Sequence, residues 1–185
     1  MPKKIIFISL FLIFFFENSN ADNKERILNE LKTTESIVFD FIQITNQIEE
    51  RGECYLLFPS KLKCIYNDKK LKELIINDTK LAITQKRYNK TYFYPLNKSP
   101  FLKILRKKEL LKLISLSDVK EEENILYFNF KDKNNQDITI LFNKISLNLK
   151  GWVTKDQFNN DINFFIKIKS KNLNFKKNFF QIPKN

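Results

Sequence analysis

The two cysteines of this 185-residue chain, Cys54 and Cys64, are its strongest candidates for covalent chemistry. They lie ten positions apart in the stretch GECYLLFPSKLKCIY, where two strand-forming runs meet at Pro59-Ser60. Such a pair can form a disulfide across a hairpin, act as a reactive dithiol, or simply fill space as two small apolar side chains. The choice among these depends on the compartment and on the register of the hairpin.

Other groups that carry chemistry are scarce. The chain contains no histidine, which removes Ser-His-Asp and Cys-His catalysis together with histidine ligation of metals. Its two glycines, Gly52 and Gly151, cannot build a glycine-rich phosphate loop. Acidic runs occur at residues 49–50 and 121–123, and we interpret both as solvated turns between strands. We therefore expect a protein that is not an enzyme and that needs no metal or cofactor.

The amino-terminal segment predicts export. Residues 1–4 are cationic, residues 5–16 form an apolar run of twelve, and residues 19–21 are small or polar. This order is typical of a secretory signal peptide cleaved after Ala21. Because a membrane-spanning helix needs roughly 20 apolar residues, an uncleaved anchor is the less favoured alternative. We expect one mature domain over residues 22–185.

The chain is strongly basic, with a net charge of +12. A basic balance can indicate nucleic acid, an anionic membrane or an acidic partner. Here the lysines are dispersed among asparagine, isoleucine and phenylalanine, which A/T-rich codons also encode. Because the chain carries an export signal as well, we expect no nucleic-acid partner.

Two helices are expected. Apolar side chains recur at helical spacing over residues 22–33. Ser99-Pro100 has the order of a cap followed by proline, and the apolar residues 101–105 come next. The basic residues 106–108 suit the carboxyl end of that second helix.

The remaining chain follows a period of two, which predicts strands. Residues 162–168 alternate between apolar and mostly polar side chains, and residues 127–130 and 138–142 form a second pair joined by a turn-rich link. Leu147 and Leu149 alternate until Gly151, where the phase shifts, and a glycine inside a strand often marks a bulge. Consecutive strands with short polar links predict an antiparallel meander.

The order of several motifs resembles a known family. They are FDFIQ, which contains Gln43, the pattern G-x-x-x-L-x-x-P over 52–59, YPLNKSPFLKIL over 94–105, a hairpin with Leu149, Trp152 and Asp156, and a terminal NFFQIP. In this order they are similar to the periplasmic outer-membrane lipoprotein carrier family, LolA, across essentially the whole mature chain.

The resemblance implies a fold and a function. The fold is α+β, with a strongly curved antiparallel sheet, an unclosed half-barrel, whose concave apolar face is covered by helices. The function is that of a periplasmic carrier that binds the acyl chains of lipoprotein cargo in an apolar cavity. Such a carrier, expected to be monomeric, receives cargo from an inner-membrane lipoprotein-releasing ABC transporter. It delivers the cargo to an outer-membrane lipoprotein receptor.

Seven apolar residues are our candidates for the lining of that cavity. They are Phe39, Phe41, Leu56, Leu62, Phe101, Leu102 and Leu105. The alternative is that they fill a packed core, because an apolar position is core by default. Better-known family members carry a basic residue before the hairpin proline to hold the lid, whereas this chain has Phe58. Either apolar contact replaces that latch, or another residue such as Arg51 supplies it.

Two other functions are compatible with the same fold. The chain could carry a free lipid or glycolipid, or it could be a periplasmic regulator or assembly factor that senses a partner with the curved sheet. The material that co-purifies with the protein separates these possibilities.

The hairpin loop decides how the cysteines lie. A three-residue loop over 58–60 sets Cys54 opposite Cys64, whereas a two-residue loop sets Cys54 opposite Ile65. Proline followed by serine is a poor match to two-residue turns, which favour glycine or asparagine at positive φ. We therefore expect the three-residue loop, with both cysteines on the concave face. A disulfide there is a hypothesis, and two reduced thiols in the cavity wall are the alternative.

Overall fold

The computed structural model describes residues 19–96, 101–131, 136–155 and 160–183. Its helices and strands, in chain order, are α1 (Ser19–Thr33), β1 (Ser36–Thr45), β2 (Ile48–Leu57), β3 (Lys61–Tyr66), β4 (Lys72–Asn77), β5 (Lys80–Gln85), the 3-10 helix η1 (Lys86–Tyr88), β6 (Lys90–Pro95), α2 (Phe101–Leu105), α3 (Lys107–Leu116), β7 (Val119–Glu122), β8 (Ile125–Lys131), β9 (Asp137–Asn143), β10 (Leu149–Lys155) and β11 (Asp161–Lys171).

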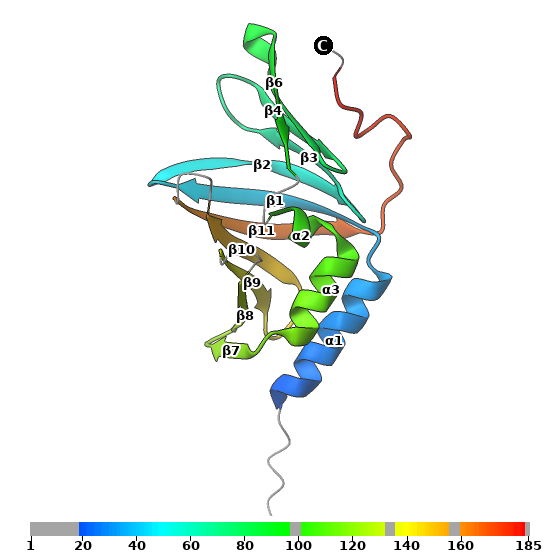
Figure 1. The fold of residues 1–185 in the computed structure, drawn as a ribbon, viewed down its shortest axis with the longest axis vertical. Helices are drawn as coiled ribbons and strands as arrows, with labels where there is room; N and C mark the ends of the chain where they lie inside the picture. Colours follow the sequence, from blue (N-terminus) through cyan, green and yellow to red (C-terminus); the bar gives the residue numbers. More distant parts are fainter. Residues whose placement is uncertain (1–18, 97–100, 132–135, 156–159, 184–185) are drawn as a thin grey trace, which may run out of the picture.

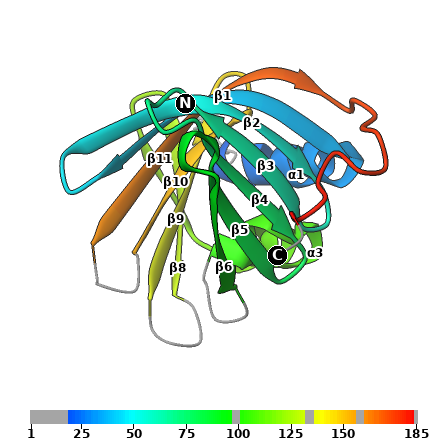
Figure 2. The same ribbon diagram turned by 90° about the horizontal axis from the view of Figure 1, so that it is seen from above.

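These strands belong to one antiparallel sheet of eleven strands, in the order β6-β5-β4-β3-β2-β1-β11-β10-β9-β8-β7. The sheet curves into an open half-barrel, and the helices lie on its concave side (Figures 1 and 2). The expected α+β architecture is confirmed. The meander is in fact two meanders, β1–β6 and β7–β11, because the first and last strands pair at the centre.

The central pair, β1 and β11, is the seam between the two meanders. Phe41 lies opposite Ile166, and Gln43 lies opposite Phe164. The register shifts between Val38 and Phe39, where an irregularity interrupts the ladder. Both strands are flanked on each side, and Phe41, Phe164 and Ile166 are buried at the middle of the concave face.

The described residues form three α-helices instead of the two expected. The apolar segment 101–105 forms α2, but the basic run does not end the helical region, because α3 begins at Lys107. Leu110 and Ile114 lie four positions apart, and both are buried. This apolar stripe continues the helical region beyond the lysines, and only Arg106 separates the two helices. The proposed cap at residues 99–100 lies outside the described residues.

The first helix extends slightly further than predicted. It begins at Ser19 instead of residue 22 and ends at Thr33, as expected. The apolar run of the predicted signal peptide lies outside the described residues. In the part of the chain that the structure describes, no helix is long and apolar enough to cross a membrane.

Several local strand predictions need correction. Glu49 and Glu50 lie in β2, and Glu121 and Glu122 lie in β7, so these carboxylates are mostly on strands and not in turns. Strand residues often carry charge where one face of the sheet meets solvent. Leu147 precedes β10 and has a positive φ of 55°. The bulge predicted at Gly151 is confirmed, because the β9–β10 register shifts between Leu149 and Gly151.

The carboxyl-terminal tail, residues 172–183, returns across the convex face of the sheet (Figure 1). The Phe179 ring lies 5.0 Å from the Tyr55 ring in an edge-to-face arrangement, and Lys63 Nζ lies 5.0 Å from the Phe179 centroid. Phe180 is buried, and its carbonyl accepts a hydrogen bond from Asn77 Nδ2 at 3.3 Å. The tail therefore packs on β2 and β3 through aromatic and cation–π contacts and is hydrogen-bonded to β4.

Candidate functional site

The concave face is apolar because the strand register places alternate side chains in rows across it. One row contains Ile37, Leu56, Leu62 and Ile76, which are direct cross-strand partners on β1 to β4. All are buried. The next row begins with Phe39 and continues through the two cysteines. These rows offer a surface without hydrogen-bonding groups.

Stacked aromatic rings continue the apolar face across the seam. The Phe41 and Phe164 centroids lie 4.9 Å apart at an interplanar angle of 13°, and Phe164 stacks on Trp152 at 4.4 Å. On the other side, Phe41 meets Tyr66 edge to face at 4.9 Å. The row from Tyr66 to Trp152 joins the two halves of the half-barrel by aromatic contact.

Gly52 makes this aromatic row possible. It lies between Phe41 and Tyr66 in the register. A Cβ atom at this position would lie 2.8 Å from Phe41 Cε1 and 2.1 Å from the carbonyl oxygen of Ile65. The Phe41 ring therefore covers backbone that only glycine leaves open.

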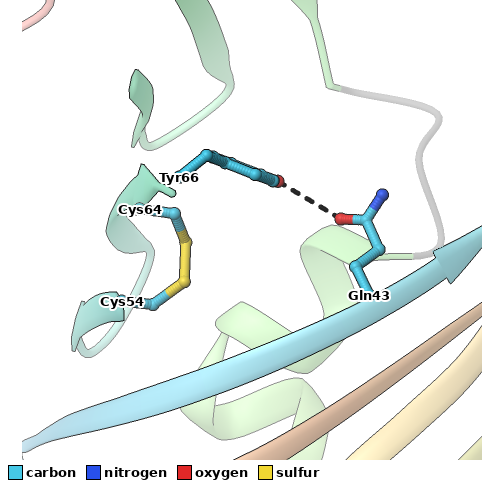
Figure 3. The surroundings of a disulfide bond; sticks show 4 residues. All are labelled: Gln43, Cys54, Cys64 and Tyr66. Carbon is cyan, nitrogen blue, oxygen red and sulfur yellow. Dashed lines mark hydrogen bonds between the residues drawn. A yellow bond between two sulfur atoms is a disulfide. The ribbon is translucent and has the colours of Figure 1, made fainter. Parts of the chain in front are cut away.

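The cysteines lie on the concave face in the register of the three-residue loop, with Cys54 opposite Cys64 and Leu57 opposite Lys61. The two sulfur atoms are joined in a disulfide, and both residues are fully buried (Figure 3). The bond links β2 to β3 in the same row as Phe39. It makes this part of the site wall a covalently closed hairpin.

A small polar group borders the aromatic row. Tyr66 Oη donates a hydrogen bond to Gln43 Oε1 at 3.2 Å (Figure 3). Lys72 Nζ lies 3.7 Å from the centroid of the Tyr66 ring and pairs with Glu50. Burial is the main cause of the raised pKa of Tyr66, and the nearby carboxylate of Glu50 adds to it. The phenol therefore stays protonated and donates its hydrogen bond at neutral pH.

The helices close the concave face. α2 contributes Leu102, Ile104 and Leu105, and α3 contributes Leu110 and Ile114, all at most 4% exposed. Ile104, Leu105, Leu110 and Ile114 belong to the same continuous core as the sheet rows. We call α2 and α3 together the lid.

The structure brings five of the seven predicted lining residues into this core. They are Phe39, Phe41, Leu56 and Leu62 from the sheet, and Leu105 from the lid. Leu102 is buried on α2 but is not part of that core. Phe101 begins α2, and its side chain lies outside the described part of the structure. The five core side chains belong to one closed, packed cluster, so the contact of the predicted residues with a ligand stays a prediction.

The aromatic ring of Phe58 contacts the lid through the side chain of Lys107. Lys107 Nζ, at the start of α3, lies 5.7 Å from the centroid of the Phe58 ring, within the range of a cation–π interaction. The same ammonium group donates a hydrogen bond to the carbonyl oxygen of Lys32 in α1 at 2.7 Å. Arg51 instead pairs with Glu49 on the surface of β2. In this contact the basic residue, Lys107, lies on the lid, and its aromatic partner, Phe58, lies in the hairpin loop.

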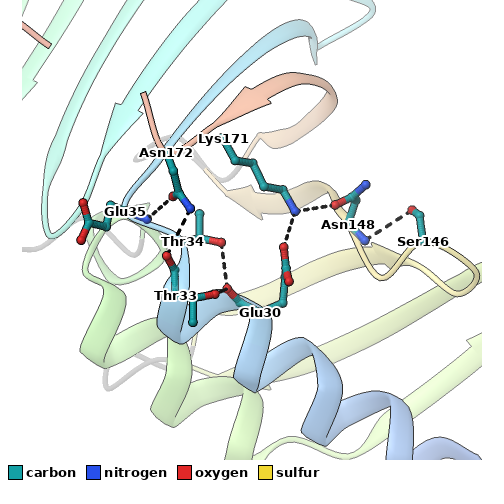
Figure 4. A network of polar contacts seen from close by, with 8 residues as sticks. All are labelled: Glu30, Thr33, Thr34, Glu35, Ser146, Asn148, Lys171 and Asn172. Carbon is teal, nitrogen blue, oxygen red and sulfur yellow. Dashed lines mark hydrogen bonds and ion pairs between the residues drawn. The ribbon is translucent and has the colours of Figure 1, made fainter. Parts of the chain in front are cut away.

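In contrast to the lid, α1 is fixed by a polar network (Figure 4). Lys171 Nζ donates to Glu30 Oε1 at 2.8 Å and to Asn148 Oδ1 at 2.7 Å. Asn172 Oδ1 accepts a hydrogen bond from the backbone N–H of Glu35 at 2.7 Å, and its amide donates to the carbonyl oxygen of Thr33. These contacts tie the end of α1 to the seam strand β11.

The comparisons with known proteins agree with this arrangement. The family model described as "Outer membrane lipoprotein carrier protein LolA" matches residues 32–183. The chain belongs to the LolA family. This match confirms the resemblance drawn from the motifs. A search of curated protein sequences found no significant match.

Solved structures with a similar fold come from several bacteria. An uncharacterized conserved protein from Thermus thermophilus is 9% identical, with a TM-score of 0.51, and the match covers 89% of this chain and 95% of that one. A LolA superfamily protein from Nitrosomonas europaea is 8% identical, with a TM-score of 0.45, and the match covers 86% of this chain and 97% of that one. MucB from Pseudomonas aeruginosa, in its complex with MucA, is 9% identical, with a TM-score of 0.48, and the match covers 89% of this chain and 61% of that one.

Sequence reasoning missed three parts of the candidate site in this chain. They are the aromatic partners Phe164 and Trp152, the helix α3, and the contact between Lys107 and Phe58. The spacing of Leu110 and Ile114 was a visible signal for α3. The other two depend on pairs of residues that are far apart along the chain, and a local pattern does not reveal them.

Proposed function

We propose that the chain is a periplasmic carrier that holds the acyl chains of a lipoprotein between the concave face of the sheet and the lid. One observation carries this proposal. Two apolar layers, the sheet rows and the lid, face each other, and few polar contacts hold the lid in place. In the described residues these include the hydrogen bonds from Lys107 to α1 and from Lys24 Nζ to the carbonyl of Ser117 at 2.8 Å.

Acyl chains supply enough free energy to displace such a lid. Burying one methylene group contributes about 0.8 kcal/mol, so a chain of about 15 methylenes contributes roughly 12 kcal/mol. An acyl chain that enters below the lid replaces contacts between Leu105 and the sheet with equally apolar contacts. The seven predicted lining residues are our proposal for that contact surface.

The family description supports a role in carrying lipoproteins. We propose that the carrier accepts acylated cargo from an inner-membrane lipoprotein-releasing ABC transporter and passes it to an outer-membrane receptor. Transfer of this kind forms and breaks no covalent bond, so the carrier needs no cofactor. It works as a monomer, because a single half-barrel supplies both layers of the site.

A charge placed under the lid tests the proposal. Leu102 is 4% exposed on α2, whereas Leu116 is 74% exposed at the end of α3. The variant Leu102→Glu puts a carboxylate where acyl chains are to lie, and Leu116→Glu is the matched control. The assay measures how much purified triacylated lipoprotein stays soluble after dilution from detergent. We expect at least a tenfold loss for Leu102→Glu and none for the control.

Thermal unfolding of both variants separates binding from folding. Leu102→Glu should keep a cooperative transition, because the lid can open and expose the carboxylate to water. If it fails to fold, Leu102→Ser takes its place. Normal solubilisation of lipoprotein by a folded Leu102 variant would contradict the site.

Mass spectrometry of material that co-purifies after gentle extraction tests the cargo class. Acylated polypeptide supports the carrier. Free lipid or glycolipid would indicate the first alternative, and an unmodified protein partner would indicate a regulator or assembly factor.

A further inference from the structure

The sheet edge at β6 exposes an unusual number of aromatic side chains. Tyr88 in η1 is 53% exposed, and Tyr92, Phe93 and Tyr94 in β6 are 42%, 42% and 47% exposed. Because side chains alternate along a strand, Tyr92 and Tyr94 lie on one face of β6, and Phe93 lies on the other. The strand is the outermost of its half of the sheet, so it presents aromatic rings to solvent from both faces.

The same edge is basic. Residues 79–95 contain four basic residues and no acidic residue. Lys86 is paired with Glu73 at 2.8 Å, but Arg87 and Lys90 form no ion pair with any residue that the structure describes. Two cations are therefore available beside Tyr88.

A second turn packs against this edge and adds to it. The backbone N–H of Arg87 donates to the carbonyl oxygen of Lys70 at 3.3 Å, and that of Lys86 donates to the carbonyl oxygen of Leu71 at 3.4 Å. Leu71 is 58% exposed, and Lys70 is exposed as well. Hydrogen bonds thus hold the β3–β4 turn and η1 together as one rim at the end of the molecule away from α1 (Figure 1).

We propose that this rim, made of Lys70, Leu71, Arg87, Tyr88, Lys90 and Tyr92, docks on the surface of an anionic membrane. Tyrosine is suited to the headgroup region, because its ring is apolar and its hydroxyl group is polar. Leucine adds an apolar contact that enters the boundary with the acyl chains. The cations of Arg87 and Lys90 complement the negative charge of anionic lipids.

Addition of a partner strand at β6 is less compatible with the same residues. Lys90 and Pro95 stand at the two ends of the strand. Lysine and proline on an edge strand oppose pairing with another strand. The exposed aromatic rings therefore need a partner that contacts side chains and not the backbone edge, as a lipid surface does.

Vesicle flotation tests the proposal without any lipoprotein, so its result is independent of the proposed cargo. The purified mature chain is mixed with vesicles of phosphatidylcholine alone or with about one third phosphatidylglycerol. We expect binding only to the anionic vesicles, and we expect it to weaken as salt rises. One basic residue near such a surface contributes about a fivefold change in binding, so the double variant Arg87→Gln with Lys90→Gln should bind about 30-fold more weakly.

The double variant Lys176→Gln with Lys177→Gln is the matched control. Both lysines are exposed in the tail, and the net charge falls by the same amount. A third variant, Tyr88→Trp, reports contact directly, since Trp152 is buried and contributes a constant background. Its emission should shift to the blue on anionic vesicles and be quenched by brominated lipid. No binding to anionic vesicles, or an equal loss in the tail control, would overturn the proposal.

Discussion

Reduction of the disulfide between Cys54 and Cys64 should destabilise the fold by an amount that follows from the chain separation. The bond closes a loop with a sequence separation of 10. In the chain-entropy treatment, a loop of about ten residues corresponds to about 2.7 kcal/mol at 25 °C, because the reduced unfolded chain gains conformational freedom. Both residues are buried, so reduction leaves two thiols in the same space and does not create a cavity.

This free energy converts into a measurable shift of the unfolding temperature. For a domain of about 160 residues, 1 kcal/mol corresponds to roughly 2–4 °C. We therefore expect the reduced protein to unfold about 5–11 °C below the oxidised protein. The urea midpoint should fall as well, and the slope should rise slightly, because the reduced unfolded chain exposes more surface.

The assay compares oxidised protein with protein that has been unfolded, reduced and refolded in the presence of reductant, because the buried bond is shielded from solvent. Intact mass confirms the redox state of each sample. The variant with Cys54→Ala and Cys64→Ala is the control, and its unfolding temperature should not respond to reductant. Equal unfolding temperatures for oxidised and reduced wild type, or two free thiols in protein isolated from an oxidising compartment, would refute the reasoning.

Three further predictions concern other parts of the molecule. Gly52→Ala should lower the free energy of unfolding by about 3 kcal/mol in urea titrations, because the new methyl group collides with the backbone of β3 and with the neighbouring aromatic ring; unchanged stability would show that the aromatic row does not depend on this glycine. Lys107→Met removes the hydrogen bond to the carbonyl oxygen of Lys32 and the cation–π contact with Phe58, so hydrogen exchange in α3 should accelerate about fivefold while exchange in β9 stays constant. If α3 exchanged at the same rate in the variant and in wild type, Lys107 would not hold the lid. Two hydrogen bonds lower the pKa of Glu53 below its ordinary value of 4.5: the one from Lys169 has the larger effect, and the one from Tyr55 adds to it. The contribution of ionised Glu53 to stability is therefore present above pH 4.5 and is lost as the pH falls through the lowered pKa. Glu53→Gln should therefore show a shallower acid-induced decrease of the unfolding temperature than wild type. Identical pH profiles for the two proteins would contradict this prediction.

The sequence predicted those features that a short stretch of chain determines. Alternating apolar residues identified β11 and the β8–β9 hairpin, and the phase shift at Gly151 identified a bulge. The Pro59-Ser60 dipeptide determined the register that sets Cys54 against Cys64. In each case, turn chemistry and strand period act within about ten residues, so one segment contains the whole signal.

Features that depend on tertiary packing were not predicted. Phe164 stacks between Phe41 and Trp152, although β1 lies at the other end of the domain sequence. The basic residues that begin α3 suggested the end of a helix, yet the burial of Leu110 and Ile114 outweighs the unfavourable charge at that end. The acidic residues of β2 and β7 suggested turns, because local composition does not reveal which strand faces solvent.

The seam between β1 and β11 has a consequence for the order in which the protein folds. The amino-terminal part of the chain is the first to enter the compartment where the protein folds, so β1 to β6 can pair in sequence, and β7 to β10 can follow. The strand that joins these two halves, β11, comes after the other ten strands that the structure describes. Until then each half exposes an apolar face and an unpaired central edge, which is the kind of intermediate that aggregates. A chain truncated before β11 would lose the middle of its sheet and not an edge, so the two halves cannot join until β11 is present.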